Sequence, residues 1–178
     1  MKKRTGVLVF FATALIGILV MWLASALRPR RKALPPGTLA DYVLIEKRSH
    51  RLTLFFKHRR LKAYRVALGR GGLGPKLKRG DARTPEGLYR VEKHISKKKY
   101  RHSLKLDFPS EQDVAMAKRR GARMGGDVLI HGLRNGLGWV GHWHRAVSWT
   151  NGSVGLTNDE MDELYHVIPD GTPVEIRA

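Results

Sequence analysis

The chain contains no cysteine, and this absence excludes several classes of protein. A disulfide-stapled scaffold, a thiolate zinc site and a cysteine nucleophile all require a side chain that the sequence lacks. Acidic residues are also scarce, with 15 Asp and Glu against 34 Lys and Arg. The resulting net charge of +19 indicates an anionic environment, such as nucleic acid, acidic lipid headgroups or a carboxylate-rich polymer.

This charge is distributed unevenly along the chain. Six acids and a single base, Arg177, follow Arg145, so this end carries −5 and residues 1–145 carry +24. Apolar residues still make up 42% of the 178 residues, which is enough for a core and argues against wholesale disorder. The length predicts one domain of ordinary size with an appendage.

The first segment predicts a membrane anchor. Residues 5–27 form an uncharged run of 23 residues, which exceeds a signal-peptide core of about 7–15 residues and suits the roughly 20 residues of a spanning helix. Small residues at 24–26 resemble a cleavage site, so a cleaved signal sequence is a second interpretation. We therefore predict residues 1–33 as anchor or signal sequence, 34–40 as linker and 41–178 as the folded domain.

Beyond residue 40 the hydrophobic pattern changes to short apolar and alternating runs, which predict strands. A glycine-rich segment at 69–75 lacks the Gly-Lys-Ser/Thr of a phosphate-binding loop, and we predict a mobile loop there. The predicted strands are 42–46, 52–56, 61–68, 88–91, 127–130 and 173–176.

Two segments carry helix-capping signals. Ser110 with Asp113 three residues later predicts a helix that ends at Gly121. Thr157 with Glu160 predicts a second helix. Several short strands with two helices predict a mostly β, α+β domain that resembles a β-sandwich.

Candidate catalytic residues lie between His131 and Ser153. His131 follows an apolar run that predicts a buried strand. Ser153 follows Gly152, and a glycine there lets the backbone turn so that neighbouring amide N–H groups point toward one spot. Acyl transfer needs such a nucleophile, a base and N–H donors. The same residues also fit a histidine in the core and a serine in a turn without a catalytic role, and such residues are more common than catalytic ones. Three of the four tryptophans fall in the same stretch and predict a packed wall or groove: 139, 143 and 149.

The same stretch resembles the catalytic domain of L,D-transpeptidases (the YkuD/ErfK family). That family's signature is His-Gly, a spacer, and then Ser/Thr-x-Gly-Cys with a hydrophobic residue next. Here His131-Gly132 matches the first part, and 18 residues separate His131 from Thr150. Thr150, Gly152 and Val154 match the second part. Further similar blocks at 80–89, 156–161 and 167–174 extend the resemblance over residues 42–176.

The resemblance implies an enzyme that modifies peptidoglycan. It implies attack on the diaminopimelate carbonyl of a tetrapeptide stem, loss of the terminal D-alanine, and resolution by an amine of another stem or by water. His131 would shuttle protons, Ser153 would take the nucleophile's position, and amides near Gly152 and Ser153 would hold the oxyanion. The remaining expected site residues are Thr150 in the site loop and Gly132, Arg134, Arg145 and Trp149 at the substrate.

The resemblance also sets expectations for partners and location. It implies no cofactor and no metal. It places the domain in the periplasm, anchored in the inner membrane through the N-terminal segment or secreted if that segment is cleaved.

Two positions depart from the family pattern. Ser153 stands where the family has its nucleophilic cysteine, and Gly155 stands where it frequently has an arginine. A serine hydroxyl is far less acidic than a thiol, so it must lose its proton to a well-placed base during attack. Three interpretations stay open: an adapted or slow serine nucleophile, a pseudoenzyme that still binds stem peptides, and a serine introduced to trap the protein. Arg134 and Arg145 are the candidates to replace the missing arginine.

Functions from other classes stay open as well. His142 and His144 would share one face of a strand, and with His131 they could hold zinc in a hydrolase. The basic portion of the chain also suits a non-catalytic, membrane-tethered binder of an anionic polymer. The densest basic run, 97–102, has no accompanying nucleic-acid-binding motif, so we expect a solvated edge or loop and no nucleic-acid partner.

Overall fold

The computed structural model describes residues 16–17, 20, 33–96 and 100–178. The predicted anchor at 1–33 and part of the basic run at 97–102 fall largely outside these residues. Within the described residues, no helix combines the length and the apolar character needed to cross a membrane. Residues 34–178 form one compact unit, and the description below concerns that unit.

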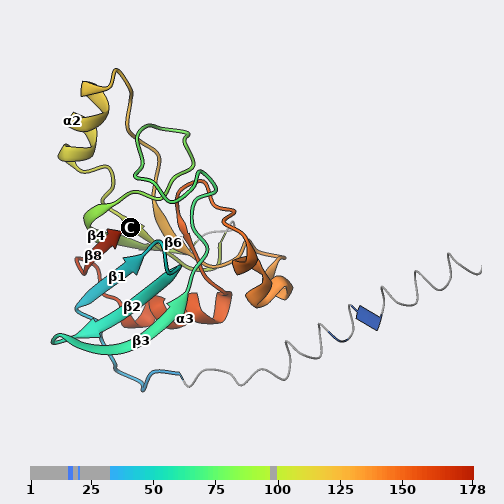
Figure 1. The fold of residues 1–178 in the computed structure, drawn as a ribbon. Helices are drawn as coiled ribbons and strands as arrows, with labels where there is room; N and C mark the ends of the chain where they lie inside the picture. Colours follow the sequence, from blue (N-terminus) through green and yellow to red (C-terminus); the bar gives the residue numbers. More distant parts are fainter. Residues whose placement is uncertain (1–15, 18–19, 21–32, 97–99) are drawn as a thin grey trace, which may run out of the picture. The chain divides into compact units, whose positions relative to one another are not determined.

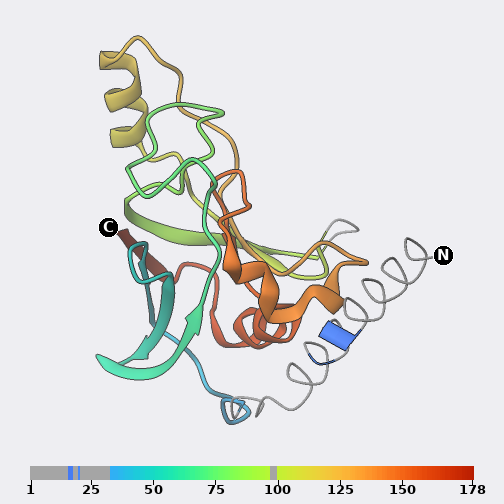
Figure 2. The same cartoon turned by 45° about the vertical axis from the view of Figure 1, so that its right-hand side comes forward.

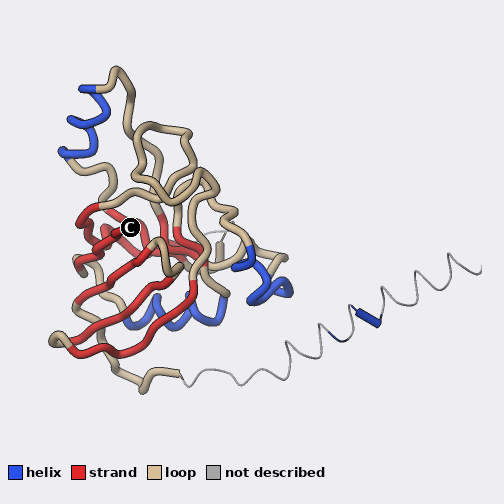
Figure 3. The backbone as a smooth tube through the Cα atoms, viewed as in Figure 1, coloured by secondary structure: helices blue, strands red, loops and turns tan. Residues whose placement is uncertain are grey.

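Eight strands of the described chain form one sheet with the order β3-β2-β1-β8-β4-β5-β6-β7 (Figure 1, Figure 3). Most neighbours are antiparallel, but β1 pairs with β8 and β6 pairs with β7 in parallel. The strands are β1 (Tyr42–Glu46), β2 (Arg51–Phe56), β3 (Arg59–Arg65), β4 (Gly87–Ile95), β5 (Ser103–Leu106), β6 (Leu129–His131), β7 (Val154–Gly155) and β8 (Pro173–Arg177).

The sheet curls until its two ends meet. The long strand β4 makes the bend, because its first half pairs with β8 and its second half pairs with β5. At the closure, Ala67 and Gly155 exchange two main-chain hydrogen bonds of 2.9 and 2.8 Å. The short strand β7 is therefore bonded on one side to β6 and on the other to the segment that follows β3.

Both predicted helices are present, and their capping explains where they begin. In α2 (Glu111–Arg119), Ser110 and Asp113 form a reciprocal capping box. In α3 (Asn158–Val167), Thr157 and Glu160 do the same. Helix α3 lies along the sheet and buries Met161, Leu164 and Val167 in the core, whereas α2 extends from the long connections beyond the sheet (Figure 1, Figure 2).

The structure corrects the predicted architecture in two respects. A single curled sheet replaces the expected sandwich, because the strands after β4 continue the same sheet instead of starting a second one. A third, 3₁₀ helix, η1 (Gly138–Ala146), occupies the segment predicted to place His142 and His144 on a strand. Gly141 breaks η1 into two parts with φ 49° and ψ −132°, a conformation that glycine adopts without a Cβ penalty.

A buried lysine fixes the long connection between β3 and β4 to the sheet. The side chain of Lys47 is fully buried just after β1. Its ammonium donates to the carbonyls of Gly74 and Thr84 at 2.9 and 2.8 Å and to the Glu86 carboxylate at 2.8 Å. Three protons thus meet three acceptors, which is the condition for burying a lysine at tolerable free-energy cost.

We predict that Lys47→Met lowers the free energy of unfolding by about 3 kcal/mol, because it leaves one buried carbonyl, one part-buried carbonyl and a carboxylate without their donor. Lys93→Met is the control, since the Lys93 side chain is 55% exposed and its pair with Glu92 contributes little. Urea unfolding of both variants measures the difference. Equal losses in the two variants would contradict this role for Lys47.

Candidate active site

The imidazole of His131 lies at the end of β6 and is almost fully buried. Its Nδ1 is 2.7 Å from the carbonyl oxygen of Gly132. A carbonyl only accepts, so Nδ1 carries the proton and donates it, and Nε2 is the basic nitrogen of the neutral ring. This arrangement suits His131 to take up a proton at Nε2.

Two aromatic rings hold the imidazole of His131. The Tyr100 ring is tilted by 31° against it, with ring centres 4.1 Å apart, and Trp149 meets it edge-on at 5.6 Å. Tyr100 is placed by a bridge between its main chain and that of Arg134. The sequence analysis expected Trp149 near the site but missed Tyr100, which stands inside a run of basic residues that carries no aromatic pattern.

Strand register brings Ser153 beside the strand that carries His131. Val154 pairs with Ile130 and Gly155 pairs with His131, so Ser153 lies next to Leu129, two positions before His131 on the neighbouring strand. The Leu129 N–H donates to Ser153 Oγ at 3.2 Å. The Ser153 hydroxyl therefore lies beside the strand that ends in His131.

The turn before Ser153 is organised by the buried hydroxyl of Thr150. Thr150 Oγ1 donates to the Ser153 carbonyl at 2.6 Å and accepts from the Gly152 N–H at 3.2 Å. The sequence predicted that the N–H groups of Gly152 and Ser153 would both donate to an oxyanion. The Gly152 N–H donates to Thr150 instead, so the Ser153 N–H is the remaining candidate. Gly152 has φ 118°, and a Cβ there would lie 2.7 Å from the Arg83 carbonyl oxygen, so only glycine fits.

The indole of Trp149 packs against Gly155. A Cβ at Gly155 would lie 3.0 Å from Cζ2 of Trp149, so the indole occupies the space into which a longer side chain would extend. The two candidate replacements for the family's arginine have different surroundings. Arg134 is exposed, and the guanidinium of Arg145 is paired with Glu160, the capping residue of α3.

Gly132 supports the site by its main chain and by its lack of a side chain. Its carbonyl orients His131, and a Cβ there would lie only 2.6 Å from Oδ1 of Asn158 at the start of α3. The structure thus brings His131, Gly132, Trp149 and the turn to Ser153 together, and it pairs Arg145 with Glu160.

A second histidine lies behind Trp149. His144 is buried, and its Nδ1 accepts a hydrogen bond of 3.3 Å from the Trp149 indole N–H. Burial, reinforced by the nearby Arg145 charge, lowers the pKa of His144 to about 4, so the ring is neutral at pH 7. Among the described residues, no three histidine or carboxylate side chains are grouped so that they could hold one metal ion.

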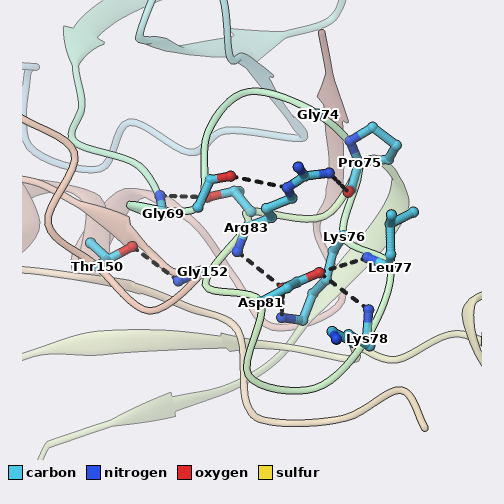
Figure 4. Close-up of polar contacts among 12 residues, drawn as sticks. Gly69, Gly74, Pro75, Lys76, Leu77, Lys78, Asp81, Arg83, Thr150 and Gly152 are labelled. Atoms are coloured by element: carbon cyan, nitrogen blue, oxygen red, sulfur yellow. Dashed lines mark hydrogen bonds and ion pairs between the residues drawn. The ribbon is translucent and has the colours of Figure 1, made fainter. Parts of the chain in front are cut away.

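In the connection between β3 and β4, the residues after the predicted mobile loop at 69–75 are tied together beside the Ser153 turn (Figure 4). The Asp81 carboxylate accepts main-chain N–H bonds from Leu77, Lys78 and Arg83 and an ion-pair bond of 2.7 Å from Lys76. Burial acts to raise the pKa of Asp81, but these four donors outweigh it and hold the pKa at about 2. Sequence analysis missed this cluster because its donors are mostly main-chain groups.

Two further contacts join this loop to the residues around β7. Leu68 accepts from the Thr150 N–H at 3.1 Å, and Arg70 donates its N–H to the Thr150 carbonyl at 3.0 Å. The start of the Thr150–Ser153 turn is thus bonded to main chain of the β3–β4 connection.

Comparison with known proteins identifies the domain. The model of the YkuD family, described as the L,D-transpeptidase catalytic domain, matches residues 40–176. Among curated proteins, the chain is similar to YafK of Escherichia coli (strain K12), which its name assigns to the L,D-transpeptidases. The two are 27% identical over 133 residues, which is 71% of this chain and 46% of YafK.

Solved structures share the fold. The helical cell shape determining protein Pgp2 from Campylobacter jejuni has a TM-score of 0.62 at 20% identity, over 88% of this chain and 54% of that one. A cysteine-to-serine mutant of an Enterococcus faecium L,D-transpeptidase has a TM-score of 0.50 at 14% identity, over 79% and 50%. The chain thus spans about half the length of these relatives.

We predict that His144 makes stability depend on pH between about 6.5 and 4. The folded protein holds His144 neutral down to a pKa of about 4, whereas the unfolded chain takes up the proton near its ordinary pKa of about 6.5. Stabilisation is therefore complete above pH 6.5 and is lost as the pH falls toward 4. Urea unfolding at pH 7 and pH 4 measures how much the free energy of unfolding falls between these two pH values. We expect this fall to be about 2 kcal/mol smaller in His144→Gln than in the wild-type protein.

Gln is chosen because its side-chain oxygen can still accept from the Trp149 indole. His58→Gln, at an exposed turn, is the control and should leave the pH dependence unchanged. Identical pH dependence in His144→Gln and the wild-type protein would show that His144 is not the group responsible.

Proposed function

The chain belongs to the L,D-transpeptidase catalytic domain family, and from that premise we propose that it is an acyltransferase acting on peptidoglycan stem peptides. The substrate in this proposal is a tetrapeptide stem that contains diaminopimelate and ends in D-alanine. The observation that carries the proposal is the parallel pairing of β6 with β7, which sets the Ser153 hydroxyl beside the strand that ends in His131.

In the proposed first step, Ser153 Oγ attacks the diaminopimelate carbonyl carbon and forms an ester. Its proton passes to Nε2 of His131, whose Nδ1–H is held by the Gly132 carbonyl. The C–N bond to D-alanine breaks, and His131 returns the proton to the departing amine. In this proposal the Ser153 N–H donates to the oxyanion of the tetrahedral intermediate.

In the second step, an amine of another stem or a water molecule attacks the ester carbonyl. His131 removes a proton from the attacking group and returns one to Ser153 Oγ as the ester bond breaks. An amine yields a cross-link and water yields a shortened stem. Both outcomes use the same residues, so the acceptor decides between cross-linking and carboxypeptidase-type hydrolysis.

The hydrogen bond from the Leu129 N–H favours a serine in this position. A hydroxyl attacks as it loses its proton, and an N–H donor to the same oxygen stabilises the negative charge that develops there. The bond also holds Oγ in place, which matters because small displacements of a nucleophile cost much of the rate.

We predict that the wild-type protein releases D-alanine from tetrapeptide muropeptides and that Ser153→Ala lowers the rate at least about a thousandfold. Ser153→Cys should retain activity, because a thiol already holds a few per cent thiolate at neutral pH. Liquid chromatography of the products measures all three proteins. Product from Ser153→Cys alone would instead support a pseudoenzyme that binds stems, and product from none would overturn the proposed activity.

We further propose that the domain works in the periplasm, attached to the inner membrane. The proposed substrate lies in that compartment, and the sequence at 5–27 is an uncharged run flanked by basic residues. We expect the full chain to fractionate with membranes and to resist extraction at alkaline pH, while protease added outside the inner membrane digests the domain. Recovery in the soluble periplasmic fraction would indicate cleavage of the segment, and protection from protease would contradict the location.

A further inference from the structure

Two buried lysines, one after β1 and one in the β3–β4 loop, differ in how many hydrogen-bond acceptors their ammonium groups have. The ammonium of Lys47 has three acceptors, as described above, so its hydrogen-bonding capacity is complete. The Lys76 side chain is only 5% exposed, yet within the described part of the chain its one hydrogen-bond acceptor is Asp81. An ammonium has three donors, so two protons of Lys76 are not used by these residues.

The ammonium of Lys76 lies beside the proposed nucleophile's turn. Its Nζ is 3.8 Å from the point that a Cβ on Gly152 would occupy, and Gly152 directly precedes Ser153. Figure 4 shows the Lys76 side chain running along Asp81 on the side of the loop that faces Gly152. A cation with unused donors is therefore placed within a few ångströms of the residues at which an acyl donor would bind.

Asp81 has hydrogen-bond donors other than Lys76. Three main-chain N–H groups, from Leu77, Lys78 and Arg83, donate to its two oxygens. The carboxylate therefore keeps most of its hydrogen bonds when Lys76 is replaced, and it can hold the ammonium in position while the other two protons bind a second anion. This is the arrangement of a preorganised anion site rather than of an ion pair that only closes a loop.

We propose that Lys76 binds a carboxylate of the stem peptide beside the scissile bond and so makes the protein selective for stems that carry this carboxylate. This inference rests on the proposed function. Two carboxylates of the tetrapeptide have the required chemistry: the terminal carboxylate of D-alanine and the side-chain carboxylate of diaminopimelate. Either forms a charge-assisted hydrogen bond with an ammonium, and an amide in its place cannot match the charge.

The test is a binding measurement that does not require turnover. Isothermal titration calorimetry measures the affinity of the full chain carrying Ser153→Ala for a tetrapeptide stem and for two analogues, each with one of the two carboxylates amidated. We expect Lys76→Met to weaken binding of the unmodified peptide by a factor on the order of 10 to 100. Lys78→Met is the matched control, because Lys78 is exposed on the same loop, and it should change the affinity less than about twofold.

The amidated analogues identify which carboxylate Lys76 contacts. One analogue should bind the Lys76-containing protein as weakly as the unmodified peptide binds Lys76→Met, with no further loss when both changes are combined. Lys76→Gln, which keeps a donor for Asp81, is a second neutral variant should Lys76→Met unfold. Thermal unfolding of each variant shows that the loss of affinity is not a loss of fold.

The results separate this inference from the proposed function. Unchanged affinity in both Lys76 variants, or an equal loss for the unmodified peptide and both analogues, would overturn the role of Lys76 while leaving the proposed reaction intact. If no stem peptide binds to the protein that retains Lys76, both proposals fail.

Discussion

The closure of the sheet between Ala67 and Gly155 is the constraint on which the candidate site depends. Strand β7 has only two residues, Val154 and Gly155, and could not hold its position by pairing on one side alone. Main-chain bonds to β6 on one side and to the segment after β3 on the other fix it from both directions. Ser153 directly precedes this strand, so the position of β7 also fixes the position of the Ser153 main chain.

Polar contacts with the main chain then build the surroundings of the nucleophile's turn. Thr150 closes the turn from within, and Asp81 organises the loop that encloses it from outside. Glycine is required where these two pieces of main chain approach, as the contact between Gly152 and the Arg83 carbonyl shows. The same close approach brings the ammonium of Lys76 beside Gly152, so one packing requirement also places a charge at the site.

Several elements followed from local sequence because their causes are local. The capping boxes at Ser110 and Thr157 predicted both α-helices, and alternation predicted most strands. Strands β5 and β7 and helix η1 were missed: the four residues of β5 and the two of β7 are too few to show a period, and the tryptophans and histidines of η1 gave no helical pattern. The curling of one sheet around β4 was not predicted, because alternation reports which face of a strand is buried and not which strand is its neighbour.

By itself, the sequence determined the chemistry available to this protein: no thiol, a histidine ending a strand, and a serine after a glycine in a family motif. These properties depend on residue type and short spacing. The tertiary structure alone decided that Arg145 pairs with Glu160 and that Lys76, Asp81 and Tyr100 lie around the candidate site. Such contacts join residues tens of positions apart, and chain closure over that distance is set by the packing of the whole sheet rather than by any local preference.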